Sequence, residues 1–588
     1  MSIIAGAISR SGLDLPQELC RALAANLSRA PGESIETFGG RGWLLAQADV
    51  GAYRCKGSIG NGVGAALVVA GEPLLGGERY ASCRNREDEL RFMFEDLRAG
   101  RTDAVESSTG TYCCAFYSAQ DHRLTLVSDK VGVRPIYYAV LPDFAVFASA
   151  LRILEAADLV GSGIDLRGAY ETSSFGFPFG ERTCYDNVRT IGPAQIVRLT
   201  RDGVSRASYF RWDRLGYAED PEGVLVSKLV ASFERAVERR LRDDRVVLSF
   251  LSGGLDSRAT VAALRRRGTQ VFTVNFAPAD TQDRVYAELA AETLGTVHHQ
   301  LNVLASRTVN ANRQEHLRGW VDSLSQRGTP PDRPGCIWSG DGGSVGLGHI
   351  YMDDATVRLL DHGDLDAAMA SFLRFNQLAG AHNGVMTRSF RATTRDWHVE
   401  AVRAEFLALD RRLDGRSLFL FLLMNDQRRH LAGHFENIDS HRFEFQLPFF
   451  DAEVLETVVR APVTAFLRHR LYYRWLEALS PAAVSIPWQV YPNHEPCPIP
   501  DPRALGYQWR KHYFGLAEER RLARAQGREG LALLTRRHFP SHLLSRSRFA
   551  AAVAFSLSGS NRLAHLTRVG ATFARAWQRA RMRGIAPT

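Results

Sequence analysis

The chain has 588 residues, a net charge of +9, and 45% hydrophobic and 23% charged residues. Such a composition is typical of globular proteins and excludes disordered, collagen-like and coiled-coil chains. The longest apolar runs, residues 418–424 and 549–555, are far shorter than the ~20 residues that cross a bilayer, so no membrane span is expected. The eight cysteines form no CxxC pair and the N-terminus lacks the segments of a secretory signal, so we expect reduced thiols and a cytoplasmic location.

The positive charge is concentrated at the C-terminus. Residues 501–588 hold 17 Arg or Lys against four acids, a net of +13, which leaves −4 for the first 500 residues. This basic tail is either a solvated set of surface helices or a docking surface for an acidic peptide or partner protein. Nucleic acid is not an expected partner, because the chain has no RRM, KH or zinc-finger pattern.

Two patterns follow one another along the chain. Up to about residue 210, short apolar runs separated by Gly, Asp and Pro turns predict strands. A predicted helix at residues 221–241 then leads into strands at 245–251, 269–276 and 296–303 that alternate with helices at 258–268 and 283–295. This alternation predicts a parallel sheet with crossover helices. A mainly helical stretch (364–475) and a Pro-dense loop (487–502) precede the tail.

The sequence SGGLDS (residues 252–257), at the end of a strand, is the sharpest feature. Gly253 and Gly254 can take positive φ and let the backbone approach a ligand, and Ser257 opens a helix whose free N–H groups favour an anion. Asp256 alone would repel phosphate, but it suits Mg²⁺, which binds one or two carboxylates together with phosphate oxygens. The motif predicts a phosphate site with a metal ligand and is neither a Walker A nor a Rossmann loop.

This loop resembles the pyrophosphate loop of the ATP-pyrophosphatase enzymes, and nearly the whole chain resembles the asparagine synthetase family. Four further stretches carry that resemblance: SDKVGVRPIYYA (128–139), FTVNF (272–276), WSGDGGSVGLGHIY (338–351) and FEFQLPFFD (443–451). The resemblance implies an α/β protein with two domains. Residues 1–210 are expected to form a glutaminase-like αββα domain of the Ntn-hydrolase type. Residues 220–588 are expected to form an ATP-pyrophosphatase-type synthetase domain with a parallel sheet, helical additions and the basic helical tail.

The N-terminal domain departs from the family where glutamine would react. The family's nucleophilic Cys at position 2 is Ser2, its glutamine-binding NGE triplet is Ala70-Gly71-Glu72, and the Asp of its DGxFAF segment is Thr109. A site without these polar anchors should bind glutamine poorly, because such hydrogen bonds carry recognition. We therefore expect an inactive glutaminase domain and a nitrogen nucleophile from elsewhere.

The synthetase domain keeps most of the family's ATP site. The resemblance implies ATP and Mg²⁺, with Asp256 as a metal ligand and Asp341 as a metal ligand or catalytic base. The family's second metal ligand is replaced by Ser344. Its pyrophosphate-binding Lys is missing, and an Arg of the tail or His494 is a possible substitute. The β,γ-phosphates are assigned to Ser252, Gly253, Gly254 and Ser257, and the adenosine to backbone groups of Phe250, Val274, Ser339 and Gly340.

The GDGGS loop and the segment PWQVYPNHEPCP (487–498) most resemble the lasso-peptide macrolactam synthetases. That resemblance implies adenylation of a side-chain carboxylate of a ribosomal precursor peptide, followed by ring closure with the peptide's N-terminal amine. The implied partners are that peptide, a leader-processing protease and a leader-recognition protein. The alternatives are an asparagine synthetase-like or β-lactam synthetase-like enzyme for small molecules, and a catalytically silent scaffold.

A base must take a proton from the attacking ammonium group. The resemblance offers Glu436 and Glu444 as candidates, with ion pairs to neighbouring Arg residues as the alternative. We expect His434 and His441 to be polar packing residues, and Asp283 to cap the helix at 284–294. The Pro-dense loop is either a rigid connector or a wall, carrying Trp488, Tyr491, His494 and Cys497, that shapes the peptide and excludes water.

Overall fold

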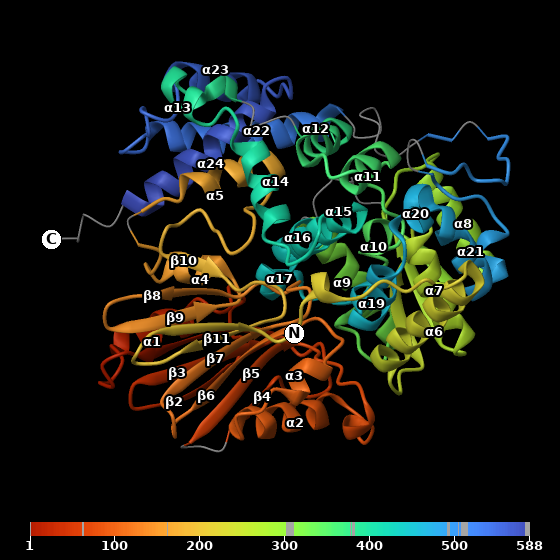
Figure 1. The fold of residues 1–588 in the computed structure, drawn as a ribbon, viewed down its shortest axis with the longest axis horizontal. Helices are drawn as coiled ribbons and strands as arrows, with labels where there is room; N and C mark the ends of the chain where they lie inside the picture. Colours follow the sequence, from red (N-terminus) through yellow and green to blue (C-terminus); the bar gives the residue numbers. More distant parts are fainter. Residues whose placement is uncertain are drawn as a thin grey trace.

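The computed structural model describes residues 2–60, 64–161, 163–301, 311–376, 378, 383–490, 494–503, 505–506 and 516–581. The N-terminal strands lie at the bottom of Figure 1, the unit around α6, α7 and α8 lies to the right, and the C-terminal helices lie at the top. None of the described helices combines the length and the hydropathy needed to cross a membrane. All eight cysteines are free thiols.

The N-terminal part consists of two six-stranded antiparallel sheets, ordered β10-β8-β9-β1-β3-β2 and β12-β11-β7-β6-β5-β4. Ile4 and Ile8 of β1 share a buried cluster with Val68 of β5, so the sheets face one another. Helices cover the two outer faces, which explains why the strands are apolar on both sides. The predicted αββα arrangement is confirmed, and its elements are β1 (Ser2–Ser9), α1 (Gln17–Ala25), β2 (Ile35–Gly40), β3 (Trp43–Asp49), β4 (Ser58–Gly60), β5 (Ala65–Gly71), α2 (Arg86–Arg98), α3 (Asp103–Ser107), β6 (Tyr112–Ser118), β7 (Arg123–Ser128), β8 (Tyr137–Val140), β9 (Phe144–Ala148), α4 (Leu151–Ala156), β10 (Val188–Thr190), β11 (Gln195–Leu199) and β12 (Val204–Ser208).

The second unit is built on a five-stranded sheet in the order β15-β14-β13-β16-β17, and every pairing in it is parallel. β14 and β16 lie on opposite sides of β13, so the strand order reverses at β13. In open sheets of this kind ligands bind beyond the carboxyl ends of the strands at such a point. The predicted parallel sheet is confirmed, with α6 (Glu222–Leu241), β13 (Val246–Phe250), α7 (Asp256–Arg266), β14 (Gln270–Asn275), α8 (Gln282–Leu294), β15 (Val297–Gln300), α9 (Ala311–Gln326), β16 (Cys336–Trp338) and β17 (Glu444–Gln446).

Helices make up most of the chain between β16 and the Pro-dense loop, as the sequence predicts. Residues Leu422–Gln427 form a π-helix between two α-helical stretches. Such π-helices are often found at functional sites. The helices of this region are α10 (Gly343–Gly346), α11 (Asp354–Asp361), α12 (Leu365–Phe375), α13 (Arg388–Thr393), α14 (Trp397–Leu407), α15 (Gly415–Phe421), α16 (Arg428–His430), α17 (Ala432–Glu436), α18 (Ile438–His441), α19 (Ala452–Arg460), α20 (Val463–Phe466) and α21 (Arg470–Leu479).

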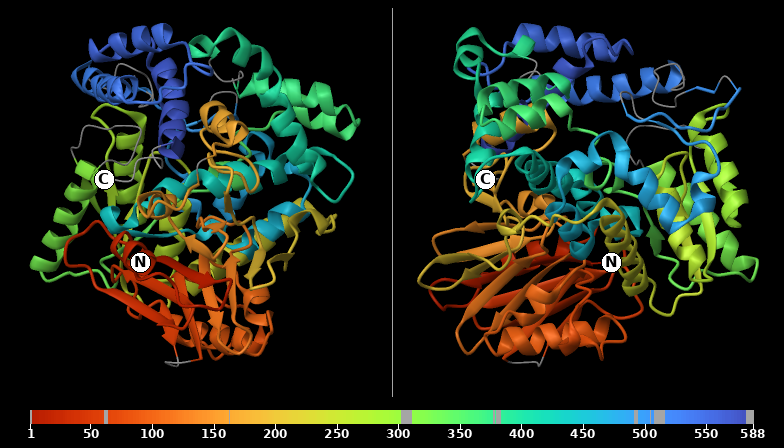
Figure 2. Two further views of the ribbon diagram at one scale, coloured as in Figure 1. Left: turned by 90° about the vertical axis from the view of Figure 1, so that its left-hand side faces the viewer. Right: turned by 45° about the vertical axis from the view of Figure 1, so that its right-hand side comes forward.

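The basic tail forms three helices, α22 (Leu516–Thr535), α23 (Arg546–Leu557) and α24 (Ala564–Arg581). They pack on one another and on α5 (Leu166–Phe175), which precedes the last strands of the N-terminal part. Tyr170 of α5 shares a buried cluster with Phe549 and Phe573 of the tail. Figures 1 and 2 show α5 against α24 in each view. The three tail helices are therefore anchored on α5 and on the segment around Met386 and Phe390.

The two sheet units share one continuous apolar core, and a buried ion pair lies within their contact. Arg134, after β7, pairs with Glu444 of β17, and both side chains are almost fully buried. Arg134 Nε also donates to the carbonyl of Thr111 at 3.0 Å, and its guanidinium lies 4.1 Å from the centre of the Phe435 ring. The acid on β17 is thus neutralised by a cation from the other unit.

Replacement of Arg134 by Met should strongly destabilise the chain. The substitution keeps the apolar volume but leaves the Glu444 carboxylate buried without its partner, which costs about 3–5 kcal/mol in comparable pairs. Urea unfolding followed by circular dichroism measures the effect. Adding Glu444→Gln should recover much of the loss, and equal stabilities of the single and double variants would contradict this account.

Candidate active site

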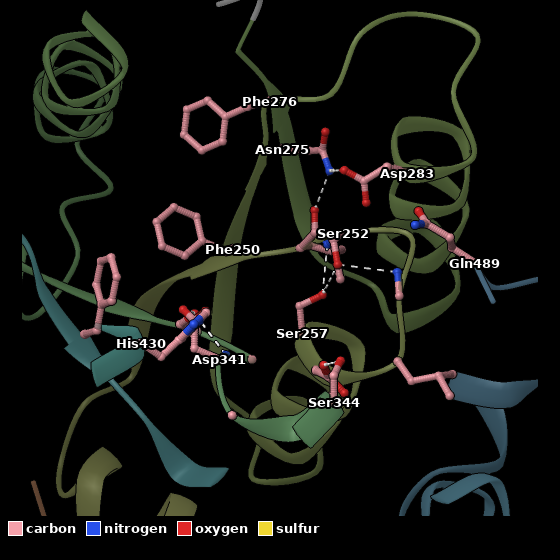
Figure 3. A pocket seen from close by; sticks show the side chains of 18 of the residues that line it. Phe250, Ser252, Ser257, Asn275, Phe276, Asp283, Asp341, Ser344, His430 and Gln489 are labelled. Atoms are coloured by element: carbon pink, nitrogen blue, oxygen red, sulfur yellow. Dashed lines mark hydrogen bonds and ion pairs between the residues drawn. The ribbon is translucent and has the colours of Figure 1, made fainter. Parts of the chain in front are cut away.

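A cavity of about 870 Å³ lies at the carboxyl ends of β13, β14 and β16. Figure 3 shows the rings of Phe250 and Phe276 on one side with Asp341 and His430 below them, the serines of the glycine loop (residues 252–257) in the centre, and Asp283 and Gln489 on the other side. The cavity brings together predicted residues from three separate parts of the sequence. These are Phe250, Ser252, Gly254, Asp256, Ser257, Val274, Ser339, Gly340 and Asp341.

The glycine loop is held by its own serines. Ser257 Oγ accepts a hydrogen bond from the N–H of Ser252 and lies 2.9 Å from Ser252 Oγ. Neither Gly253 nor Gly254 has a positive φ, so that expectation was wrong. Gly253 is required for a different reason: a Cβ there would lie 2.7 Å from the carbonyl oxygen of Gln282. The loop depends on close backbone approach and not on left-handed geometry.

Asp283 fixes this loop, and it does not cap α8. Thr281 is the N-cap, because its side chain accepts from the N–H of Arg284. Asp283 Oδ1 accepts from the N–H of Gly253 at 2.7 Å, and its other oxygen lies 3.5 Å from Asn275 Nδ2. The sequence shows the acid after the second strand, but only the folded sheet places it beside Gly253.

Asp256 opens α7 at the floor of the cavity. Its carboxylate accepts hydrogen bonds from Tyr472 OH, at 2.6 Å, and from Ser344 Oγ. Burial, together with the nearby charge of Asp341, raises the pKa of Asp256 to about 6. The two hydroxyls act in the opposite direction, because they favour the ionised form. Ser344, which stands where the family has a second acid, therefore supports Asp256 as a hydrogen-bond donor.

Asp341 belongs to a polar cluster on the opposite wall. Its carboxylate accepts from Ser339 Oγ and lies 3.2 Å from His430 Nε2. Burial favours the neutral acid, but the hydrogen bonds and charge of His430 outweigh it and hold the pKa of Asp341 below its ordinary value. The same contact raises the pKa of His430. Each group thus favours the charged form of the other.

The residues present suit a magnesium ion bound together with phosphates. Among the described residues no group of three or more His, Cys, Asp or Glu could enclose a metal by itself. Asp256 and Asp341 are close enough for the charge of one to raise the pKa of the other, and both line the cavity. Mg²⁺ commonly takes one or two carboxylates and completes its shell with phosphate oxygens and water. Asp256 and Asp341 are the residues that would hold it.

Tyr472→Phe should shift the pH dependence of nucleotide binding upward. The tyrosine hydroxyl lowers the pKa of Asp256 towards its ordinary value, so its removal should raise that pKa above about 6. Because the ionised carboxylate is needed to hold Mg²⁺, MgATP affinity should then be lost at a higher pH as the pH falls. Calorimetric titration between pH 5 and 8 measures how the MgATP affinity falls with pH. Tyr473→Phe is the matched control. The prediction fails if the two variants give the same profile.

The two predicted base candidates are not brought to the cavity. Glu436 accepts a hydrogen bond from Tyr137 OH at 2.6 Å, and Glu444 pairs with Arg134. Glu444 is buried and Glu436 is half-buried against the N-terminal unit, and neither lines the cavity. The alternative given for them, an ion pair with a neighbouring Arg, describes Glu444, but its partner comes from the other unit.

The cavity lining contains no arginine or lysine within the described part of the chain. Neither suggested substitute for the missing Lys is found there. His494 packs against His469, with ring centres 4.8 Å apart, and none of the described arginines of the tail lines the cavity. Four acids face the space: Asp256, Asp283, Asp341 and Glu495.

The Pro-dense loop forms part of the cavity wall. Trp488, Gln489, Val490 and Glu495 line the cavity, and the N–H of Gln489 donates to the carbonyl of Gly253 at 2.9 Å. Trp488 is buried and stacks on Tyr473. Tyr491 lies outside the described residues. Cys497 does not line the cavity, and its thiol donates to the carbonyl of Ile499.

Several lining residues carry no local signal in the sequence. His430, His434 and His441 come from the short helices α16 to α18, and Gln427 from the π-helix before them. The ring of His434 stacks on that of Phe445, with centres 3.7 Å apart, and its Nε2 donates to the carbonyl of Phe443 at 2.8 Å. Burial lowers the pKa of His434 to about 3. It is a neutral packing residue that also faces the cavity. The number of histidines on this wall could be found only from the fold.

The former glutamine site is altered in the structure as well. Ser2 is buried on β1, and its Oγ has no hydrogen-bond partner among the described residues. Glu72 forms ion pairs with Arg242 and Arg333, at 3.3 and 3.7 Å, and accepts from Gln446 Nε2 at 3.0 Å. A carboxylate engaged in this way is not free for an amino-acid ligand. These contacts support the prediction of an inactive glutaminase-like domain.

Fold and cavity together define a class of protein: an αββα domain joined to a parallel-sheet domain with a ligand-sized cavity at its strand ends. Residues 228–324 match the family model of asparagine synthase, and residues 93–210 match that of a glutamine amidotransferase domain. The N-terminal domain is therefore glutamine amidotransferase-like, and residues 228–324 of the second domain are similar to asparagine synthase. The predicted fold class is confirmed.

Curated relatives point the same way. The chain is 24% identical over 233 residues to asparagine synthetase [glutamine-hydrolyzing] 3 of Bacillus subtilis, a match that covers 37% of this chain and 38% of the relative. It is 27% identical over 235 residues to asparagine synthetase [glutamine-hydrolyzing] 2 of the same organism, covering 36% and 30%. The matched part thus spans about a third of the length of these relatives. A solved B. subtilis glutamine phosphoribosylpyrophosphate amidotransferase, with ADP and GMP, aligns over 59% of this chain and 77% of its own at 11% identity and a TM-score of 0.23, too low to carry an argument.

Proposed function

We propose that the protein is an ATP-dependent, AMP-forming amide ligase that closes a lactam ring in a ribosomally made peptide. One observation carries the proposal: a glycine loop at a helix N-terminus shares a cavity with two carboxylates and with a wall from the Pro-dense loop. The first two features suit a nucleoside triphosphate with its metal. The wall provides a separate surface for a second substrate.

In this proposal each part of ATP has its own place in the cavity. The backbone around Phe250, Val274 and Gly340 lines the end of the cavity that would take adenosine, and the glycine loop would take the β- and γ-phosphates. Bound Mg²⁺ would neutralise phosphate charge and make pyrophosphate a better leaving group. Asp256 and Asp341 would hold it. Asp283 and the two loop serines keep the Gly253 backbone in place for the phosphates.

The chemistry then has two steps. A side-chain carboxylate oxygen of the peptide bonds to the α-phosphorus of ATP as the bond to the β-phosphate oxygen breaks, which gives an acyl-adenylate and pyrophosphate. The peptide's N-terminal nitrogen next bonds to the acyl carbon, AMP leaves, and the nitrogen loses a proton to a base or to water. The enzyme must hold amine and acyl carbon together and keep water out, because water would hydrolyse the adenylate.

The described cavity lining offers no arginine or lysine to bind the α-carboxylate of a free amino acid. Free aspartate would bring an α-carboxylate into a space whose described lining holds four acids and no Arg or Lys. Burying an anion without a partner is costly. A side-chain carboxylate within a peptide brings no second anion, because its backbone is neutral at that residue. The altered N-terminal domain also suggests an amine that does not come from glutamine.

A small-molecule amide former is the second candidate, because the curated relatives are named asparagine synthetases. The two functions separate in one assay with ATP and Mg²⁺. A leader-free core peptide with an internal Asp or Glu should yield AMP, pyrophosphate and a product lighter by one water. AMP formed with aspartate and ammonia, and none with peptides, would favour the alternative, and ADP as the product would refute both. The proposal implies two partner proteins, a protease that frees the N-terminal amine and a leader-recognition protein.

A further inference from the structure

Arg258 is a buried cation directly behind the glycine loop. It lies in the first turns of α7, two residues after Asp256, and its side chain is fully buried. Within the described chain it forms no ion pair with a carboxylate, and its guanidinium is held by backbone carbonyls. An arginine still carries its charge at neutral pH under these conditions. Its charge is therefore met by neutral dipoles alone.

Those dipoles belong to the wall segment, residues 485–490, and to the turn before it. Arg258 Nη1 donates to the carbonyls of Ala483 and Ile486, at 3.0 and 3.3 Å. Nη2 donates to the carbonyl of Pro487 at 3.0 Å and lies 3.5 Å from that of Gly253. The planar fork thus binds several carbonyls that no helix or strand satisfies.

The same Gly253 carbonyl accepts from the N–H of Gln489. Figure 3 shows Gln489 beside the glycine loop, on the side away from Phe250. Glycine loop and wall segment are consequently joined at two points, through Arg258 and through Gln489. Trp488 and Val490, on either side of that second point, face the cavity.

We propose that Arg258 is a positioning residue that couples the two substrate sites: it fixes the wall segment to the glycine loop and lends the loop its positive charge. The inference rests on the proposed function, in that phosphates occupy the loop. The nearby guanidinium charge would stabilise a phosphate anion bound at the loop, because charges interact strongly in a buried setting. Because Arg258 is anchored in α7 and bound to wall carbonyls, an anion held at the loop should also hold the wall in place.

Two probes, MgATP and magnesium pyrophosphate, test this with the full chain. Hydrogen exchange followed by mass spectrometry reports on the wall segment, and calorimetry reports on affinity. In the wild type either ligand should slow exchange in the wall segment. Arg258→Met should weaken pyrophosphate binding on the order of tenfold, and its wall segment should exchange faster and no longer respond to ligand.

Arg265→Met is the matched control. Arg265 lies on the same helix and also binds backbone carbonyls, those of Leu294 and Thr269, but at the far end of α7. Its loss should leave both readouts unchanged. Arg258→Lys should keep most of the affinity, because the charge stays, but should lose the response of the wall, because an ammonium group cannot reproduce the planar fork.

The outcomes are distinct. Wild-type affinity in Arg258→Met, or a wall that still responds to ligand, overturns the inference. If that variant does not fold, Arg258→Lys decides: a lost wall response supports the coupling and an intact one refutes it. A wild type that binds neither probe would overturn the proposed function together with this inference, whereas wild-type binding with an unresponsive wall overturns the inference alone.

Discussion

Asp256→Asn should abolish AMP formation, with a loss on the order of 10³-fold or more, since the metal's main protein ligand would be neutral. The amide has nearly the shape of the carboxylate but one acceptor oxygen in place of two. It cannot accept from both Tyr472 and Ser344, which bind the two oxygens of Asp256. Pyrophosphate exchange into ATP in the presence of substrate measures the first chemical step directly.

Asp353→Asn provides the comparison for this change. Asp353 is the N-cap of α11 and accepts from the N–H of Thr356 at 2.7 Å, away from the cavity lining. Asn caps helices about as well as Asp, so exchange should stay at the wild-type level. Substantial turnover by the Asp256 variant at saturating Mg²⁺ would remove that residue from its assigned role.

The nucleotide half of the site is predictable because its signals are local. Residues 246–266 contain an apolar strand, then the SGGLDS loop, then a helix. The direction of the strand fixes the end of the sheet at which the loop lies. Asp341, in the GDGGS loop after another strand, was expected from the resemblance to the asparagine synthetase family. In a parallel sheet the carboxyl ends of neighbouring strands meet at one edge. The sequence therefore indicates which residues gather there before any contact is known.

The other half depends on contacts between distant segments. Asp256 receives its hydrogen bond from Tyr472, 216 residues later, and Glu444 meets Arg134, 310 residues earlier. No periodicity or spacing encodes such pairs. Glu444 lies on a short buried strand between the two units, and in that position an acid needs a cation within reach more than it can serve a substrate. The resemblance marked the segment correctly but not the direction in which its side chain points.

Gly340→Ala should weaken MgATP binding on the order of 10²-fold, the second large effect we expect, because a misplacement of about 1 Å in a site can cost that much. A Cβ at this position would lie 2.3 Å from the Ser257 nitrogen and 2.6 Å from the Asp256 carbonyl carbon. Side-chain carbons do not approach backbone so closely, so the strand end at Ser339 and the start of α7 would have to separate. Gly340 has no positive φ, so the alanine backbone itself is unstrained. The effect is therefore purely steric, on the contact that sets Asp341 opposite Asp256.

Gly346→Ala separates this steric effect from a general cost of alanine in the stretch WSGDGGSVGLGHIY (338–351). A Cβ there meets nothing closer than 3.7 Å, at Leu455 Cδ2, and Gly346 lies in α10, where alanine is the better helix former. Calorimetric titration with MgATP should give wild-type affinity for this variant and the large loss for Gly340→Ala, with both proteins folded by circular dichroism. Equal affinities would mean that the two loops can part without disturbing the nucleotide. Asp256 and Asp341 would then not act on a common ion, because a shared ion requires both carboxylates to stay within one coordination shell.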